Sequence, residues 1–144
     1  MIDKSKELNT SIRLVNNRLN FIGTAGENEP VSIDYILPLG DNLGYTSLEL
    51  LLLSLTSCLG SAILTFLRKM NKTITGCEIH AKGLRNEEHP TGFKNIFVEI
   101  ALNSTDVAED DMIKVIKLSE EKYCPVWSML KGNVDIEVHF EINQ

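Results

Sequence analysis

The hydrophobic pattern changes twice along the chain, from short alternating stretches to one long apolar run and back to alternation. Alternating apolar and polar residues are typical of strands with one buried face. The pattern predicts two strands within Ile12–Ile22 and one strand each in Val31–Leu37, Ile74–Lys82, Phe93–Leu102 and Val134–Ile142. Between the first two strands, Asn16 and Asn17 tolerate the positive φ angles of a tight hairpin turn.

The apolar run Leu50–Leu67 contains 18 residues without a charge. This is long enough to test against a membrane span, but serine, threonine and glycine interrupt it and no aromatic belt marks its ends. We therefore expect a helix in a protein core, closed by Arg68 and Lys69 near its negative dipole end. A helix that is apolar on nearly every side must be covered all round. A chain of 144 residues has little material for such a cover, which makes burial between two subunits attractive.

Two further helices are expected in the second half of the chain. Asp106–Tyr123 has the helical period, with Met112, Ile113 and Ile116 as its inner stripe and Asp106 as its N-cap. A short helix over Pro125–Lys131 follows, because proline is favoured at a first helical position and Gly132 can end the helix. These elements predict an α+β fold with antiparallel strands and segregated helices.

Length, composition and charge narrow the class of protein. The 144 residues, 43% of them apolar, fit one domain over residues 1–144 and are too apolar for disorder. A formal charge of -6 without a basic run makes nucleic acid an unexpected partner. The first residues have no apolar core of the kind that a signal peptide needs. Together with three cysteines, this predicts free thiols in a reducing compartment, the cytoplasm.

The three cysteines have different surroundings. Cys77 lies on the apolar face of a predicted strand and is interpreted as a small buried hydrophobe. Its C-x-x-H spacing to His80 is rejected as a metal site, because alternation places the thiol and the imidazole on opposite faces. Cys58 lies in the middle of the long helix, either as core filling or as a reactive thiol, since nearby serines leave space and donors around it. Those serines are Ser54, Ser57 and Ser61.

Cys124 is the predicted N-cap of the short helix that begins at Pro125. A thiol in this position faces the positive end of the helix dipole and unpaired N–H groups, which favour its thiolate. Nearby Lys122 adds a positive charge. The sequence is compatible with either a reactive or a structural thiol at Cys124.

Two motifs taken together resemble the OsmC/Ohr family of osmotically induced protein C and organic hydroperoxide resistance proteins. The first is Leu48-Glu49-Leu50-Leu51 with Leu55-Thr56-Ser57-Cys58 in the long helix. The more specific one is Ser119-Glu120-Glu121-Lys122-Tyr123-Cys124-Pro125-Val126. The order of elements agrees from about Asn17 to Ile142, and the resemblance is to the OsmC-like branch more than to the Ohr branch proper.

The resemblance implies an intertwined homodimer, with curved antiparallel sheets wrapped around two long central helices. It also implies a thiol peroxidase for organic, lipid-type hydroperoxides that binds no cofactor and no metal. In that mechanism Cys58 attacks the peroxide and becomes a sulfenic acid. Cys124 then forms a disulfide with Cys58, and an external dithiol, lipoyl-linked in the Ohr branch, reduces it.

The chain departs from the family pattern around the reactive cysteine. Family members pair that cysteine with a glutamate and an arginine. Glu49 is the candidate glutamate, but it is one residue closer to the cysteine than in Ohr proteins, and Ser47 stands near the place of their proline. Glu49 also completes a capping box with Thr46, and nine helical residues separate it from Cys58 by about 13 Å. It is therefore a cap, a catalytic residue or both.

Arg18, just after the Asn16-Asn17 turn, is the candidate arginine that stabilises the thiolate. Arg13 on the same hairpin is the fallback, and either one is otherwise a solvated charge. The alternative to a peroxidase is a non-enzymatic OsmC-fold protein that binds a small apolar ligand or a partner at the dimer cleft. Among the remaining residues, Trp127 and Met129 are expected in the core or in a pocket wall, and the histidines at the surface. The histidines are His80, His89 and His139.

Overall fold

The computed structural model describes residues 5–144 and divides into two compact units, one ending at Leu51 and one beginning at Leu52. The first unit contains the strands β1 (Ser11–Leu14), β2 (Phe21–Thr24) and β3 (Val31–Ile33). The second contains β4 (Gly76–Arg85), β5 (Phe93–Asn103), α2 (Glu109–Leu118), the π-helical turn η1 (Ser119–Tyr123), α3 (Pro125–Leu130) and β6 (Asp135–Asn143). The helix α1 (Ser47–Lys69) begins in the first unit and runs through the second. The predicted α+β class is confirmed.

The first unit is an antiparallel sheet in the order β1-β2-β3. Its hairpin differs from the prediction, because residues 15–20 connect β1 and β2 without a positive φ at Asn16 or Asn17. Instead, the Asn16 side chain accepts hydrogen bonds from the backbone N–H groups of Arg18 (3.0 Å) and Asn20 (3.1 Å). A side chain that folds the backbone in this way removes the need for a left-handed residue.

β3 ends at Ile33, four residues earlier than its alternation predicts. The cause is Asp34, which is buried and accepts hydrogen bonds from the backbone N–H groups of Tyr35 (2.7 Å), Asp41 (3.3 Å) and Leu43 (3.2 Å). One carboxylate thus organises the loop that follows the strand.

α1 starts with the predicted capping box. The Thr46 N–H donates to the Glu49 carboxylate (2.8 Å), and the Glu49 N–H donates to the Thr46 hydroxyl (3.2 Å). These two bonds satisfy donors that the first helical turn leaves unpaired. The backbone and side-chain hydrogen bonds from Thr46 also lower the pKa of Glu49.

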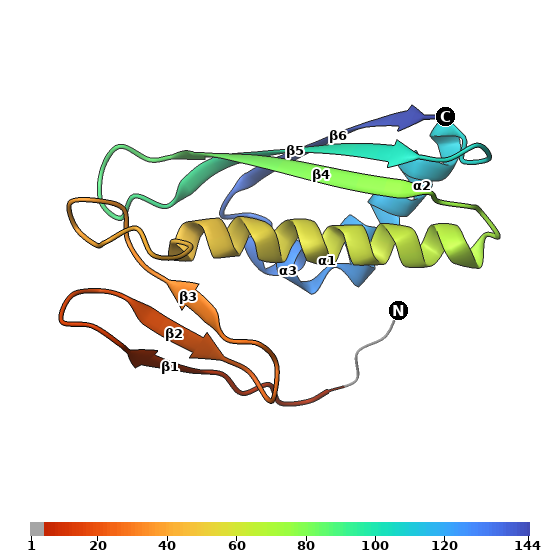
Figure 1. Cartoon of the computed structure of the whole chain (residues 1–144). Coiled ribbons are helices and arrows are strands. Elements are labelled where there is room, and N and C mark those ends of the chain that lie inside the picture. The colour runs from red at the N-terminus through yellow and green to blue at the C-terminus, as the bar shows by residue number, and fades with distance from the viewer. Residues whose placement is uncertain (1–4) are drawn as a thin grey trace. The chain divides into compact units, whose positions relative to one another are not determined.

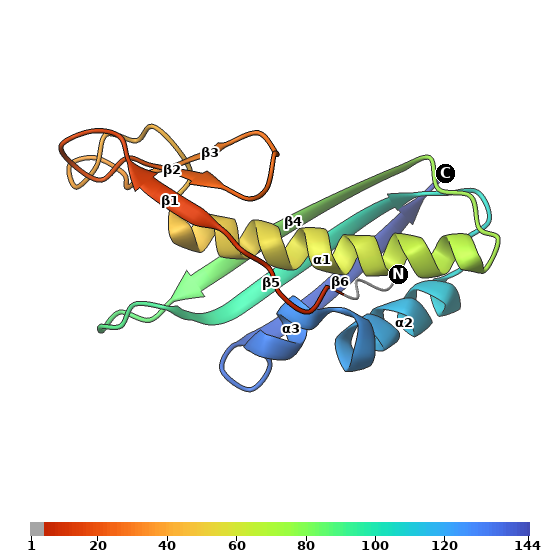
Figure 2. The ribbon, with the colours of Figure 1, turned by 90° about the horizontal axis from the view of Figure 1, so that it is seen from below.

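The second unit is the sheet β4-β5-β6 with helices on one of its faces. Figure 1 and Figure 2 show α1 lying across this sheet, with α2 and α3 beside it on the same face. β5 pairs with β4 antiparallel but with β6 parallel, which corrects the expectation of antiparallel strands throughout. The segment of α2, η1 and α3 forms the crossover that a parallel pair requires.

The core of the second unit lies between α1 and the inner face of the sheet. Its fully covered side chains come from every fourth position or so of α1 and from alternate positions of β5: Leu55, Leu59, Ile63, Leu67, Ile96, Val98, Ile100 and Leu102. Gly60 allows a close approach, since a Cβ at this position would lie 2.8 Å from Cδ1 of Ile79 on β4. Within the described residues, α1 is the one helix long and apolar enough to cross a membrane, a property that buried core helices share.

α2 begins later than predicted, and its N-cap is Ala108 instead of Asp106. The Asp106 carboxylate accepts instead from the Thr73 N–H (2.9 Å) and the Ser104 hydroxyl (3.0 Å). Asp106 therefore fixes the chain between α1 and β4 against the end of β5, a long-range contact that a local capping pattern does not reveal.

Candidate functional site

Two of the three cysteines meet in the second unit. Cys58 lies half-buried in the middle of α1, and Cys124 lies buried between η1 and α3. The side chains of the two cysteines lie close enough for Cys58 to raise the pKa of Cys124, although the two residues are 66 positions apart in the sequence. All three cysteines are free thiols in this structure. The fold thus brings together the two thiols that the family resemblance singles out.

The short helix α3 fixes the position of Cys124. The Cys124 sulfur accepts a hydrogen bond from the Trp127 N–H (3.4 Å), and Pro125 occupies the first turn, so the predicted N-cap is confirmed. Gly132, with φ of +93°, follows the helix in a conformation that suits glycine. Trp127 is buried as expected, whereas Met129 is 71% exposed and does not belong to the core.

The protonation of Cys124 differs from the expectation. Burial, together with a smaller effect of the neighbouring Cys58, raises the pKa of its thiol to about 12, against the opposing effect of the Trp127 and Val126 N–H groups. The helix terminus therefore does not yield a thiolate here, because desolvation of the charged form outweighs two N–H contacts. At neutral pH Cys124 is a proton-bearing thiol held against Cys58.

The candidate arginine and glutamate have local partners within the first unit. The Arg18 guanidinium forms an ion pair with Asp41 (2.7 Å) and donates to the carbonyl oxygens of Pro38 and Leu39. Glu49 is held by Thr46 in the capping box. Arg13 lies in β1 opposite Ile22, with its side chain exposed. Arg18 and Glu49 therefore each have a local structural role that does not involve a cysteine.

Cys77 lies on β4, opposite Leu102 of β5. Burial raises the pKa of its thiol, which disfavours the thiolate, the reactive form of cysteine. The alternation along β4 places Cys77 on the covered face and the neighbouring Glu78 on the exposed face, as predicted.

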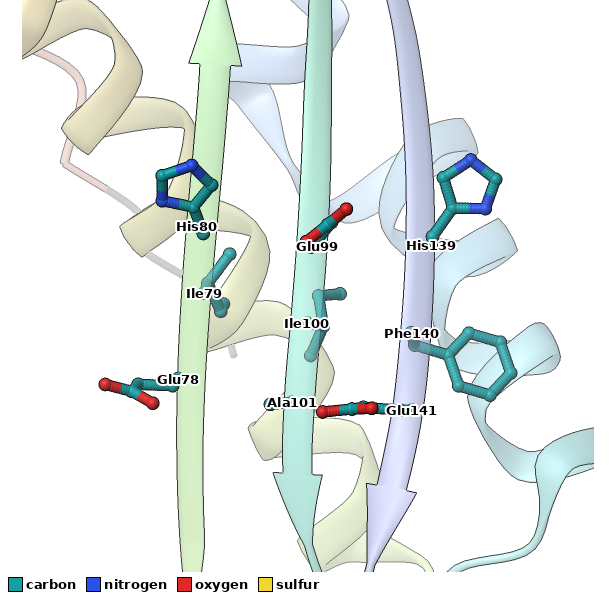
Figure 3. Close-up of a pocket in the computed structure, with 9 residues that line it drawn as sticks. All are labelled: Glu78, Ile79, His80, Glu99, Ile100, Ala101, His139, Phe140 and Glu141. Carbon is teal, nitrogen blue, oxygen red and sulfur yellow. The ribbon is translucent and has the colours of Figure 1, made fainter.

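A shallow hollow lies on the outer face of the same sheet, away from the helices (Figure 3). His80, Glu99 and His139 stand in one row across β4, β5 and β6, and His139 forms an ion pair with Glu137 (2.9 Å). Within residues 5–144, no three His, Cys, Asp or Glu side chains are grouped so that they could hold a metal ion. The histidines are exposed, as predicted. No cysteine is among the described residues that line the hollow.

The π-helical turn η1 is the feature of the site that the sequence pattern did not reveal. The pattern predicts a regular helix up to Tyr123, but the Cys124 N–H donates to the carbonyl of Ser119, five residues earlier (2.9 Å). Such turns occur frequently at functional sites. No residue type in this segment distinguishes it from a regular helix in advance.

Comparisons with known proteins agree with this fold. The model of the family described as OsmC-like protein matches residues 40–139. Protein YhfA of Escherichia coli strain K12 is 26% identical over 124 residues, which cover 86% of this chain and 90% of that protein. The chain belongs to the OsmC-like protein family, as the two cysteine motifs predict.

Solved structures show the same fold. A hypothetical protein from Aquifex aeolicus VF5 superposes with a TM-score of 0.84 and 25% identity, covering 96% of this chain and 98% of that one. The organic hydroperoxide resistance protein OhrB of Bacillus subtilis gives a TM-score of 0.65 at 19% identity, covering 94% and 98% of the two chains. The fold is therefore shared with OsmC-like and Ohr proteins.

Proposed function

We propose that this protein is a thiol peroxidase that reduces organic, lipid-type hydroperoxides, with Cys58 as the nucleophile and Cys124 as the resolving thiol. The observation that carries the proposal is the proximity of the two cysteine side chains, one on α1 and one at the start of α3, which is close enough for Cys58 to raise the pKa of Cys124. Two thiols in such contact can form a disulfide after a small movement, and membership of the OsmC-like family supports this chemistry.

The proposed reaction balances without a bound cofactor. The Cys58 thiolate attacks the distal peroxide oxygen, the O–O bond breaks, and the leaving alkoxide takes up a proton to give an alcohol. Cys58 has then lost two electrons and carries a sulfenic acid. Cys124 attacks the Cys58 sulfur, the S–S bond forms, and the hydroxyl leaves with the Cys124 proton as water. An external dithiol of the lipoyl type reduces the disulfide to two thiols.

The protonated state of Cys124 suits this role. A thiol whose pKa is raised to about 12 does not compete with Cys58 for the peroxide, since the thiolate is the attacking form. It carries the proton that the sulfenic hydroxyl needs in order to leave as water. The two cysteines thus have unequal tasks, although they are in contact.

We propose that the working form is a homodimer in the cytoplasm. Ile36, Leu37 and Leu39 in the loop after β3 are 61%, 64% and 65% exposed, and exposed apolar side chains next to one another are typical of a surface that a second chain covers. Size-exclusion chromatography with light scattering tests this part of the proposal, and a monomer at micromolar concentration contradicts it.

Titration of the free thiols with cumene hydroperoxide, followed by mapping of the disulfide by mass spectrometry, tests the proposed function. We expect two thiols to be lost per chain, a Cys58–Cys124 disulfide, and Cys77 still free. A peroxide-treated protein that keeps all three thiols, or that links Cys77 to either of the others, contradicts the proposal.

A second candidate is a non-enzymatic protein that binds a small apolar ligand or a partner. It is favoured by the local hydrogen bonds of Arg18 and Glu49, which account for both groups without catalysis. Glu49→Gln separates the two functions of this residue, because glutamine still accepts the Thr46 N–H but carries no charge. If Glu49 is only a cap, the peroxidase rate stays within about twofold of the parent, whereas a catalytic carboxylate predicts a loss of about 10- to 100-fold.

The matched control is Thr46→Ala, which removes the hydroxyl cap and leaves the Glu49 carboxylate in place. It is expected to cost about 1 kcal/mol of stability without a specific loss of rate. Steady-state rates with cumene hydroperoxide and dihydrolipoamide, together with urea denaturation of each variant, provide the measurement.

A further inference from the structure

The backbone hydrogen-bond pattern of the helix changes just before Cys124. The Ser119 N–H still donates to the Val115 carbonyl, four residues earlier, as in an α-helix. The Cys124 N–H donates to the Ser119 carbonyl, five residues earlier, at 2.9 Å. The turn η1 between them therefore holds one more residue than a regular turn would.

The extra residue decides where the next side chain lies. Successive residues of an α-helix are rotated by about 100° and advance by about 1.5 Å. Without the extra residue, the position of Cys124 would differ by a rotation and a rise of this order. Its sulfur would then no longer have the same position relative to the Cys58 side chain, which lies close enough here to affect the pKa of Cys124.

The turn is anchored at its start. Ser119 is fully buried, and its hydroxyl donates to the Val115 carbonyl at 2.7 Å. This carbonyl also accepts a hydrogen bond from the Ser119 backbone N–H. Two hydrogen bonds therefore stabilise the last turn of α2 at the point where the π-helical turn begins. In addition, the Glu120 carboxylate forms an ion pair with Lys131, just after α3, at 3.3 Å.

The turn is also anchored to the helix that carries the other cysteine. The ring of Tyr123, the last residue of η1, packs on the ring of Phe66 on α1 with centroids 4.7 Å apart and planes inclined by 57°. Phe66 follows Cys58 by eight residues on the same helix. The residue directly before Cys124 is thus tied to α1 through an aromatic pair of the kind that adds stability beyond buried area.

We propose that the π-helical turn Ser119–Tyr123, fixed by the Phe66–Tyr123 pair, is a positioning element that sets the Cys124 sulfur for disulfide formation with Cys58. This inference rests on the proposed function, because it assigns a structural origin to its resolving step. A disulfide needs the sulfurs at about 2.05 Å with a defined dihedral angle, so errors of an ångström are costly. Tyr123 and the extra residue of η1 are positioning residues; neither touches the substrate.

The test is the equilibrium between the dithiol and the disulfide in glutathione redox buffers, measured on Cys77→Ser protein so that two cysteines remain. Deletion of Glu121, an exposed residue of η1, restores α-helical spacing. The matched control is Glu121→Ala, which changes the same side chain but keeps the spacing. We expect the deletion to lower the equilibrium constant for disulfide formation by at least about tenfold, and the control to stay within about twofold.

A second pair of variants keeps the test decisive if the deletion prevents folding. Tyr123→Ala removes the ring that packs on Phe66, and Tyr123→Phe retains it. We expect a loss of at least about fivefold in the equilibrium constant for Tyr123→Ala alone. Folded deletion and alanine variants that match the parent overturn the inference.

The glutathione equilibrium is independent of peroxide chemistry. A parent protein that forms the Cys58–Cys124 disulfide in the redox buffer but consumes no hydroperoxide refutes the proposed function and leaves the positioning role intact. A parent that consumes hydroperoxide, with a disulfide equilibrium that is unchanged by deletion of Glu121 and by Tyr123→Ala, refutes the positioning role alone.

Discussion

Cys58→Ser is expected to reduce hydroperoxide consumption by at least about a thousandfold, to the rate of the buffer. A peroxide O–O bond requires a soft, ionised nucleophile, and a serine hydroxyl is neither soft nor ionised at neutral pH. Serine also cannot form the sulfenic acid on which the disulfide step depends. The measurement is the consumption of cumene hydroperoxide with dihydrolipoamide as reductant. Unchanged turnover in this variant would exclude Cys58 as the nucleophile.

Two control variants separate loss of the nucleophile from loss of the fold. Cys77→Ser removes the thiol on β4, which is not one of the proposed pair, so its activity is expected to match that of the parent. Without added dithiol, Cys124→Ser is expected to consume about one equivalent of peroxide and to accumulate the sulfenic acid, because the neighbouring thiol that resolves it is missing. Trapping with dimedone should then detect a Cys58 adduct that is scarce in the parent.

Elements whose formation depends on local pattern could be predicted from the sequence. The alternation from Val134 to Ile142 corresponds to β6, and the uncharged run Leu50–Leu67 lies within α1. The capping box at Thr46 and the N-cap at Cys124 also form as predicted, because each depends on residues within four positions. These features depend on interactions between residues that are close in sequence, so the sequence alone is enough to predict them.

Features that depend on distant partners could not be predicted from the pattern. The parallel pairing of β6 with β5 depends on the path of the intervening helices. The Asp106 carboxylate accepts a hydrogen bond from the N–H of Thr73, 33 residues earlier, instead of capping the helix. Asn16 forms its turn through its side chain instead of a left-handed backbone. In each case a tertiary contact or an alternative hydrogen bond replaces the local preference.

Some features of the candidate site could likewise be predicted from the sequence, and others could not. The meeting of Cys58 and Cys124 follows from the family resemblance, whereas the protonation of Cys124 follows from burial, which a helix-terminus argument does not include. Arg18 shows the same difference: its charge suggests a partner for a thiolate, and in the structure its guanidinium pairs with Asp41. Residue type indicates which chemistry is available, and packing determines which groups can use it.

Ile63→Ala is expected to lower the free energy of unfolding by about 3 kcal/mol, through the lost burial and the cavity left behind. Ile63 is 0% exposed on α1, between the helix and the sheet. The control is Ile113→Ala on α2, where the isoleucine is 51% exposed, so its predicted place in the inner stripe of the helix was wrong. The expected loss for this variant is under about 1 kcal/mol.

The comparison between these two isoleucines isolates burial. Both substitutions exchange a β-branched residue for alanine within a helix, so the gain in helix propensity is similar in both and largely cancels. Urea denaturation at one fixed protein concentration is the measurement, since any association of subunits adds to the apparent stability. Equal losses in the two variants would show that α1 does not form the centre of this core. A larger loss for Ile63→Ala would show that the helix carrying Cys58 is among the most stably packed parts of the second unit. Such a helix is the rigid support that close contact between two thiols requires.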